Sequence, residues 1–305
     1  MSNAIGLRFY RVTLHEERAS ATIENDDARL FHGERHLLSE FIRKHTTVTN
    51  VDEAQRGWFF DQPIGADSRT VSGRITYGVH GIVSRFVDIV DRKEKFKRKA
   101  SDLEEIPLYF KLYRPKAEHY MIFAFQSFGV RSCINLVQSA FRKYVKDKSG
   151  LTVRFRKLMP AEAGIEPFAA GIVKEMTFLK RKVSSDRVDS YRDDAPAEYD
   201  VKLSLLAKGR TNFGLYRDLS PEKVKKAGHS IILVDDFDKA TVRVNLDGNT
   251  KYITMFGNQG EAGTIDVTDD EDLDIEDGHP TKESLDKVIE PLLKHFNNAL
   301  IGYRS

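Results

Sequence analysis

Cysteine and long apolar runs are nearly absent from this sequence of 305 residues, and each absence excludes a class of protein. The single cysteine, Cys133, excludes an internal disulfide and any zinc site built from several thiolates. Because it lies in VRSCINLVQ, a predicted helix, we interpret it as a small buried hydrophobe rather than a nucleophile. No stretch approaches the roughly 18 apolar residues of a membrane-spanning helix, and the start, MSNAIGLRFYRVTL, lacks a secretory signal pattern. We therefore expect a soluble, cytoplasmic protein.

The sequence also lacks the short motifs that carry phosphate-binding or nucleophilic chemistry. It contains no G-x-S-x-G, no G-x-x-x-x-G-K-[ST] and no G-x-G-x-x-G. The glycine-rich GNQGEAG, Gly257 to Gly263, has no predicted helix after it, so no helix dipole would hold a phosphate there. We expect a flexible loop at this point, no cofactor and no metal.

Two histidines, His32 and His36 in HGERH, have the i and i+4 spacing that lets both side chains reach one metal ion. The zinc protease patterns need a glutamate immediately after the first histidine or before the second. Gly33 and Arg35 occupy those positions, and the arginine adds a positive charge. Two helix-surface histidines are therefore the favoured interpretation.

The carboxylates of DDFDK, Asp235, Asp236 and Asp238, leave a metal-dependent nuclease open as an alternative. Such enzymes place an acidic residue and a lysine on one face of a strand, with one residue between them. Asp238 instead adjoins Lys239, so on a strand the two side chains would point to opposite faces. Only a bend at this point would allow the nuclease chemistry.

The acidic stretch DLDIEDG, Asp272 to Gly278, resembles part of a calcium-binding EF-hand loop. Asp272, Asp274 and Glu276 match the alternating ligands, and Glu283 stands at the twelfth position. Asp277 occupies the position of the glycine, however, and flanking helices are not predicted. A solvated acidic loop is the favoured interpretation.

Net charge is distributed very unevenly along the chain. Residues 1–90 carry 11 lysines and arginines against 12 aspartates and glutamates, residues 91–182 carry 21 against 10, and residues 183–305 carry 16 against 24. The formal total of +2 therefore hides a basic middle and an acidic end. This segregation predicts an anionic partner for the middle, an internal pairing of the middle with the end, or both.

Hydrophobic periodicity predicts an α+β fold with antiparallel β-meander sheets, flanking amphipathic helices and two lobes. Strands are expected at IGLRFYRVTL, IPLYFKLYR and HYMIFAFQSFG, and a helix from Val130 to Gly150. The segment SGRITYGVHGIVSRFVDIVD is expected as one long strand or a bent pair, because Gly78 and Gly81 allow a bulge or a tight bend. The segment PAEAGIEP, with two prolines and a glycine, predicts a boundary between domains at 1–160 and 168–305. A proline at 291 predicts a kink or break in the C-terminal helix.

Three basic clusters lie in the first of these domains and point to a phosphate-rich partner. The stretch RKEKFKRK is expected in the connection between two strands, the second cluster on the helix, and the third on the strand LTVRFRKL. Repeated positive charge is what phosphate binding needs, and Phe96 is placed to stack on an unpaired base. The predicted nucleic-acid-binding residues are Arg92, Lys93, Lys95, Phe96, Lys97, Arg98, Lys99, Arg142, Lys143, Lys146, Arg154 and Arg156.

These clusters predict a protein that binds DNA or RNA without a catalytic centre, with the acidic residues 266–277 as an intramolecular competitor. The alternatives are the nuclease and a scaffold subunit that docks a protein partner or a second copy through residues 264–305. In its opening RFYRVTL and its KEMTFLKR strand the chain resembles bacterial proteins of antiviral-defence and mobile-element loci. This resemblance implies a role near phage or plasmid nucleic acid, for example as a sensor subunit, and transfers no functional residue.

Overall fold

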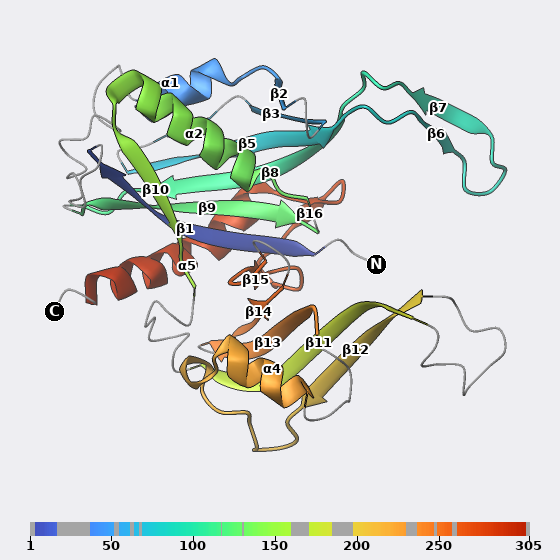
Figure 1. The fold of residues 1–305 in the computed structure, drawn as a ribbon, viewed down its shortest axis with the longest axis vertical. Helices are drawn as coiled ribbons and strands as arrows, with labels where there is room; N and C mark the ends of the chain where they lie inside the picture. The colour runs from blue at the N-terminus through green and yellow to red at the C-terminus, as the bar shows by residue number, and fades with distance from the viewer. Residues whose placement is uncertain are drawn as a thin grey trace. The chain divides into compact units, whose positions relative to one another are not determined.

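The chain has an α+β fold with a large antiparallel sheet, as its hydrophobic periodicity predicts (Figure 1). The computed structural model describes residues 4–16, 37–51, 55–61, 64–66, 69–116, 118–129, 131–159, 171–184, 198–229, 237–246, 249–257 and 261–302. None of the helices in these ranges is long and apolar enough to span a membrane.

Two compact units divide the chain, and each contains segments that are distant in the sequence. Unit 1 comprises Met1–Arg8, Lys157–Leu273 and Asp286–Ser305. Unit 2 comprises Phe9–Arg156 and Asp274–Leu285. The predicted boundary segment, residues 160–167, lies outside the described residues, so the division into 1–160 and 168–305 stays a prediction.

The sheet of unit 2 is built on a meander of long strands. Its strand order is β1-β9-β8-β5-β3-β2, with β10 pairing to β1 and β4 pairing to β5. The pairs β2–β3, β3–β5, β5–β8 and β8–β9 are antiparallel. The bounds are β1 Ile5–His15, β2 Thr49–Val51, β3 Arg56–Phe60, β4 Gly65–Ala66, β5 Thr70–Val79, β8 Glu104–Tyr113, β9 Tyr120–Phe128 and β10 Thr152–Lys157.

Two helices, α1 (Leu37–Lys44) and α2 (Ile134–Ser149), close the core of unit 2 with their apolar sides. Phe41 of α1 and Phe141 of α2 meet with ring centroids 5.0 Å apart, and both are almost fully buried. The helix α2 confirms the predicted amphipathic helix, and it ends where Gly150 adopts a left-handed conformation with φ of 72°. A glycine is favoured at that position because it has no Cβ.

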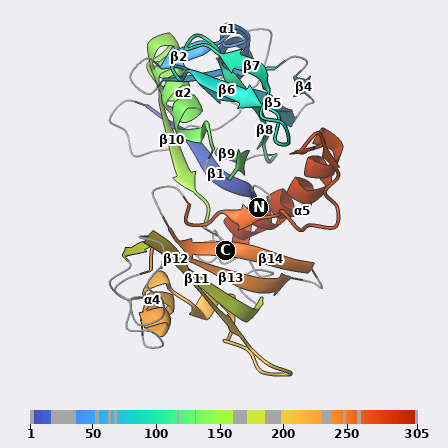
Figure 2. The same ribbon diagram turned by 90° about the vertical axis from the view of Figure 1, so that its right-hand side faces the viewer.

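Unit 1 contains a second antiparallel arrangement with strand order β12-β11-β13-β14-β15-β1. Helix α4 (Pro221–His229) lies on one side of these strands (Figure 2), and Lys225 Nζ is 5.1 Å from the ring centre of Phe256. Ser220 caps the start of α4, because its Oγ accepts a 3.2 Å hydrogen bond from the Lys223 amide. The strands are β11 Ile172–Ser184, β12 Glu198–Leu206, β13 Lys239–Leu246, β14 Asn249–Phe256 and β15 Ile265–Asp266.

The C-terminal segment forms one continuous helix, α5 (Lys282–Gly302), with Pro291 inside it. Of the kink or break predicted at Pro291, the break is therefore wrong. Its apolar stripe is buried, at Leu285, Val288, Ile289, Leu292, Leu293 and Phe296. Burial of that stripe stabilises the helix and compensates for the loss of the backbone hydrogen bond that the proline cannot donate.

Candidate functional site

The basic stretch RKEKFKRK forms part of a projecting two-stranded hairpin, which we call the β6–β7 arm (Ile82–Lys99). Strand β6 (Ser84–Val87) pairs antiparallel with β7 (Glu94–Arg98), in a register that sets Arg85 opposite Lys97. Figure 1 shows the arm extending away from the sheet of unit 2. The sequence placed this stretch in a connection between strands, and the structure shows that the connection is itself a small sheet.

Aromatic and cationic residues alternate along the arm and so occupy different faces. Phe86 lies opposite Phe96, with ring centroids 6.0 Å apart, and Arg85 lies opposite Lys97. Successive side chains of a strand point to opposite faces, so the two phenylalanines share one face and the two cations the other. The arm exposes seven large apolar side chains: Ile82, Val83, Phe86, Val87, Ile89, Val90 and Phe96.

Hydrogen bonds within the loop at the tip of the arm fix its shape. The Asp88 amide donates to the Lys93 carbonyl at 2.8 Å, and Asp88 Oδ1 accepts from the Val90 amide at 2.8 Å. Arg92 adopts a positive φ of 56°, the conformation that turns the chain back into β7. The loop presents Ile89 and Val90 outward, with 95% and 88% of their surface exposed.

Ion pairs on the arm use some of its cations and leave others without a carboxylate. Lys95 Nζ lies 2.6 Å from Asp88 Oδ2, and Lys93 Nζ lies 2.9 Å from Asp91 Oδ2. The hydrogen bond from Lys95 lowers the pKa of the Asp88 carboxyl, which is therefore ionised at neutral pH. Within the described residues, no carboxylate lies within ion-pairing distance of the Arg92 or Lys97 side chain. Exposed pairs of this kind contribute little to stability.

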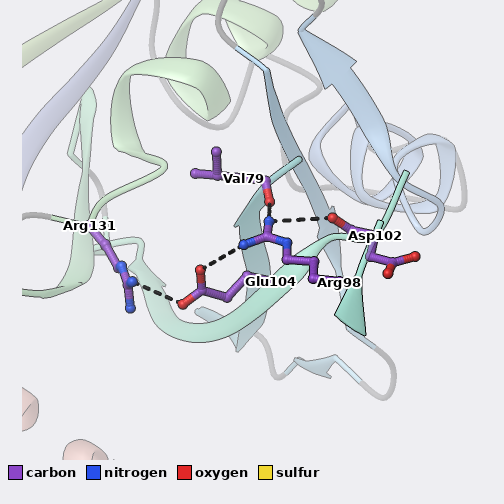
Figure 3. A network of polar contacts seen from close by, with 5 residues as sticks. All are labelled: Val79, Arg98, Asp102, Glu104 and Arg131. Atoms are coloured by element: carbon purple, nitrogen blue, oxygen red, sulfur yellow. Dashed lines mark hydrogen bonds and ion pairs between the residues drawn. The ribbon is translucent and has the colours of Figure 1, made fainter. Parts of the chain in front are cut away.

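Arg98 fixes the base of the arm and is not available to a ligand. Its side chain is only 7% exposed, and its guanidinium donates to the Val79 carbonyl, to Glu104 Oε2 at 3.3 Å and to the Asp102 carbonyl at 3.4 Å (Figure 3). Arg131 holds the other oxygen of the same glutamate at 2.9 Å. We therefore remove Arg98 from the predicted phosphate-binding residues and assign it to the anchor of the arm.

Two glycines at the base of the arm allow the chain to leave β5. A Cβ on Gly78 would collide with the carbonyl oxygen of Glu104 on the neighbouring strand. Gly81 has a positive φ of 86°, and its amide donates to the Ala100 carbonyl at 2.7 Å across the base of the arm. Both positions favour glycine for steric reasons, and a tight bend at these glycines is what the sequence predicts.

The second and third basic clusters come together on helix α2 and strand β10, and we call them the α2–β10 group. It contains Arg142, Lys143 and Lys146 on the helix and Arg154 and Arg156 on the strand, all five exposed. The Arg142 guanidinium lies 5.0 Å from the ring centre of Phe155, which joins the two elements directly. The second and third of the predicted clusters therefore lie on neighbouring elements.

The β6–β7 arm does not converge with the α2–β10 group. Both belong to unit 2, and Figure 1 shows the arm projecting on the side of the sheet opposite to β10 and the C-terminal end of α2. A single continuous phosphate track through all three clusters is therefore not formed. The molecule carries two separate basic surfaces.

The other candidate residues have structural roles or fall outside the described residues. Burial raises the pKa of the Cys133 thiol to about 12, which leaves the thiol protonated and unreactive at neutral pH. Asp238 accepts hydrogen bonds from the Arg181 amide at 2.6 Å and from Lys180 Nζ at 3.4 Å. His32, His36, Asp235 and Asp236 lie outside the described residues.

The calcium-loop-like stretch folds as a small hairpin. Strands β16 (Ile275–Glu276) and β17 (His279–Pro280) flank Asp277 and Gly278, which have positive φ angles of 48° and 80°. This is the conformation of a two-residue hairpin turn. Nearby, Asp270 forms an ion pair with Lys251, so part of the acidic segment is already neutralised. The described residues contain no cluster of three potential metal ligands.

Sequence reasoning missed Phe86, Ile89 and Val90 as candidate functional residues. They belong to an apolar run whose pattern predicts the end of a buried strand. The signal that could have found them is Asp88 and Asp91, two turn-forming residues between the runs IVSRFV and KFKRK. Comparison with known proteins finds no family model that matches the chain and no similar curated protein.

Proposed function

We propose that the protein binds nucleic acid through the β6–β7 arm. The observation that carries this proposal is the combination of net positive charge with exposed apolar and aromatic side chains on one projecting element. The arm has seven lysines and arginines against three carboxylates, and its two phenylalanines are 52% and 54% exposed. A loop that served only as a solvated connection would gain nothing from these exposed rings.

Phosphates would contact the cations that have no carboxylate nearby, Arg92 and Lys97. Each phosphate neutralised by such a side chain releases counterions, and this release makes the affinity fall with salt. The opposite face offers Phe86 and Phe96 to bases, whose stacking on an aromatic ring contributes about 1–3 kcal/mol per base. The arm thus has separate groups for the backbone and for the bases.

The α2–β10 group offers a weaker interface, although its charge is similar. Its apolar side chains are buried beneath it, and Arg142 is stacked on Phe155. This group has cations but exposes no aromatic pair. We therefore assign the primary contact to the arm and treat the α2–β10 group as the matched comparison.

Fluorescence anisotropy with labelled single-stranded and duplex oligonucleotides tests the proposal across a range of salt. The double variant Arg92→Gln/Lys97→Gln should bind about tenfold more weakly, and its salt slope should fall by about 2 because two phosphate contacts are lost. The control, Lys143→Gln/Arg156→Gln, removes the same charge from α2 and β10. It should bind within about threefold of the wild type.

Two results would contradict the proposal. The first is no binding by the wild-type protein at low salt. The second is an equal or larger loss in the control variant, which would move the interface to the α2–β10 group. The predicted role near phage or plasmid nucleic acid stays a prediction under either result.

A further inference from the structure

The tip of the β6–β7 arm carries the two most exposed of the large apolar side chains in the described residues. Ile89 is 95% exposed and Val90 is 88% exposed. Both are β-branched and therefore stiff at χ1, and the loop that holds them is closed by its own hydrogen bonds. Ile89 and Val90 thus form a small apolar surface on a hydrogen-bonded loop, at the end of a hairpin that extends from the sheet (Figure 1).

The two carboxylates next to Ile89 and Val90 are paired with lysines. Asp88 is held by Lys95, and Asp91 is held by Lys93, on the two sides of Ile89 and Val90. The carboxylates are therefore neutralised locally and oppose an anionic ligand only weakly. Behind the tip, Arg85 lies 3.9 Å from Glu94, and Lys97 on the facing strand adds positive charge.

We propose that Ile89 and Val90 form a wedge that enters a base step of duplex DNA and kinks it. This inference rests on the proposed function, since the cations of the arm supply the attraction to the phosphates. Apolar side chains that insert between stacked bases unstack them partially and bend the duplex, and this unstacking costs free energy. Contacts of the flanking lysines and arginines with the bent backbone offset this cost.

The geometry favours a duplex over a lipid surface. Ile89 and Val90 lie between Asp88 and Asp91, whose carboxylates pair with Lys95 and Lys93, so insertion into a bilayer would bring these four charged groups to a medium that disfavours them. A base step is shallow enough to take two aliphatic side chains while the ion pairs stay in the groove. Flexible pyrimidine–purine steps are the expected position, because they unstack at the lowest cost.

The test uses the full chain and a duplex with 2-aminopurine at a central TA step. Its fluorescence rises when the base loses its stacking, and anisotropy of a terminal label reports binding in the same sample. The wild-type protein should raise the 2-aminopurine signal severalfold. The variant Ile89→Ser/Val90→Ser should still bind, with a loss below about tenfold, but without the rise. The control Val83→Ser alters an apolar side chain that is 62% exposed and lies before β6, and it should behave as the wild type.

The possible failures separate the two proposals. Binding without any 2-aminopurine response, or an equal response in the wedge variant, overturns the wedge and leaves nucleic-acid binding intact. No anisotropy change overturns nucleic-acid binding and the wedge with it. Association with vesicles of phosphatidylserine and phosphatidylcholine that requires Ile89 and Val90, in the absence of duplex binding, would assign the tip to lipid instead.

Discussion

The β6–β7 arm and the α2–β10 group are both basic, but they differ in what happens to the apolar residues beside their charges. On α2, Phe141 is 2% exposed and Val145 is fully buried, so the cations lie above a packed core. On the arm, Phe86 and Phe96 contact each other and stay half exposed. The two regions therefore share positive charge and differ in the burial of the aromatic residues beside it, and the proposed binding through the arm rests on this difference.

The largest expected effect on stability comes from replacing a phenylalanine by alanine in each of the two regions. Phe141→Ala should lower the free energy of unfolding by about 3–5 kcal/mol, because it leaves a cavity under α2. Phe96→Ala should change it by no more than about 0.5 kcal/mol, since the ring is 54% exposed. Urea denaturation followed by circular dichroism measures both values. Similar losses in the two variants would show that the aromatic pair of the arm is structural.

The anchor of the arm should give the next largest effect. Arg98→Met removes a guanidinium that bonds to Glu104 and to two backbone carbonyls, and we expect a loss of about 2 kcal/mol. Hydrogen exchange should also show faster exchange of the Gly81 amide, which donates across the base of the arm. The neighbouring Lys97→Met is the control and should change neither. Unchanged exchange in Arg98→Met would mean that strand pairing alone holds the arm.

The smallest expected effect on stability comes from replacing one cationic residue in each region by alanine. Arg142→Ala should destabilise the protein by about 0.5–1 kcal/mol, because it removes the stacking of the guanidinium on Phe155. Lys97→Ala should leave the melting temperature unchanged, since its side chain is exposed and lies near no carboxylate of the described chain. If Lys97→Ala lowered the melting temperature as much as Arg142→Ala, the contrast between the two regions would not hold.

Regular periodicity explains which parts of the fold could be predicted from the sequence. The strand β1 alternates, the helix α2 repeats apolar residues at spacings of three and four, and both were predicted with correct types. The order β5-β8-β9 confirms the predicted meander, but the place of β1 was not predicted, because its pairings with β9, β10 and β15 join residues that are far apart in the chain. Local patterns contain no information on such partners.

The candidate site was predicted in part, through its charges. The basic residues of the arm were identified, but the hairpin was not, because its turn residue with positive φ is Arg92 rather than a glycine or asparagine. Arg98 could not be distinguished from its neighbours, since the sequence of RKEKFKRK does not show which cation points toward Glu104. Burial of that one side chain depends on the strands β5 and β8, which are outside the stretch.

The pairing of β5 with β8 continues to Val79 opposite Glu104, the two positions from which the chain departs into the arm and returns. The arm is thus an insertion into a hairpin that is already complete, and a two-residue turn would be enough to join the two strands without it. Evolution can lengthen, exchange or delete such an insertion without altering the meander that carries it. Homologous chains with an intact core and a different arm, or none, are the expected consequence.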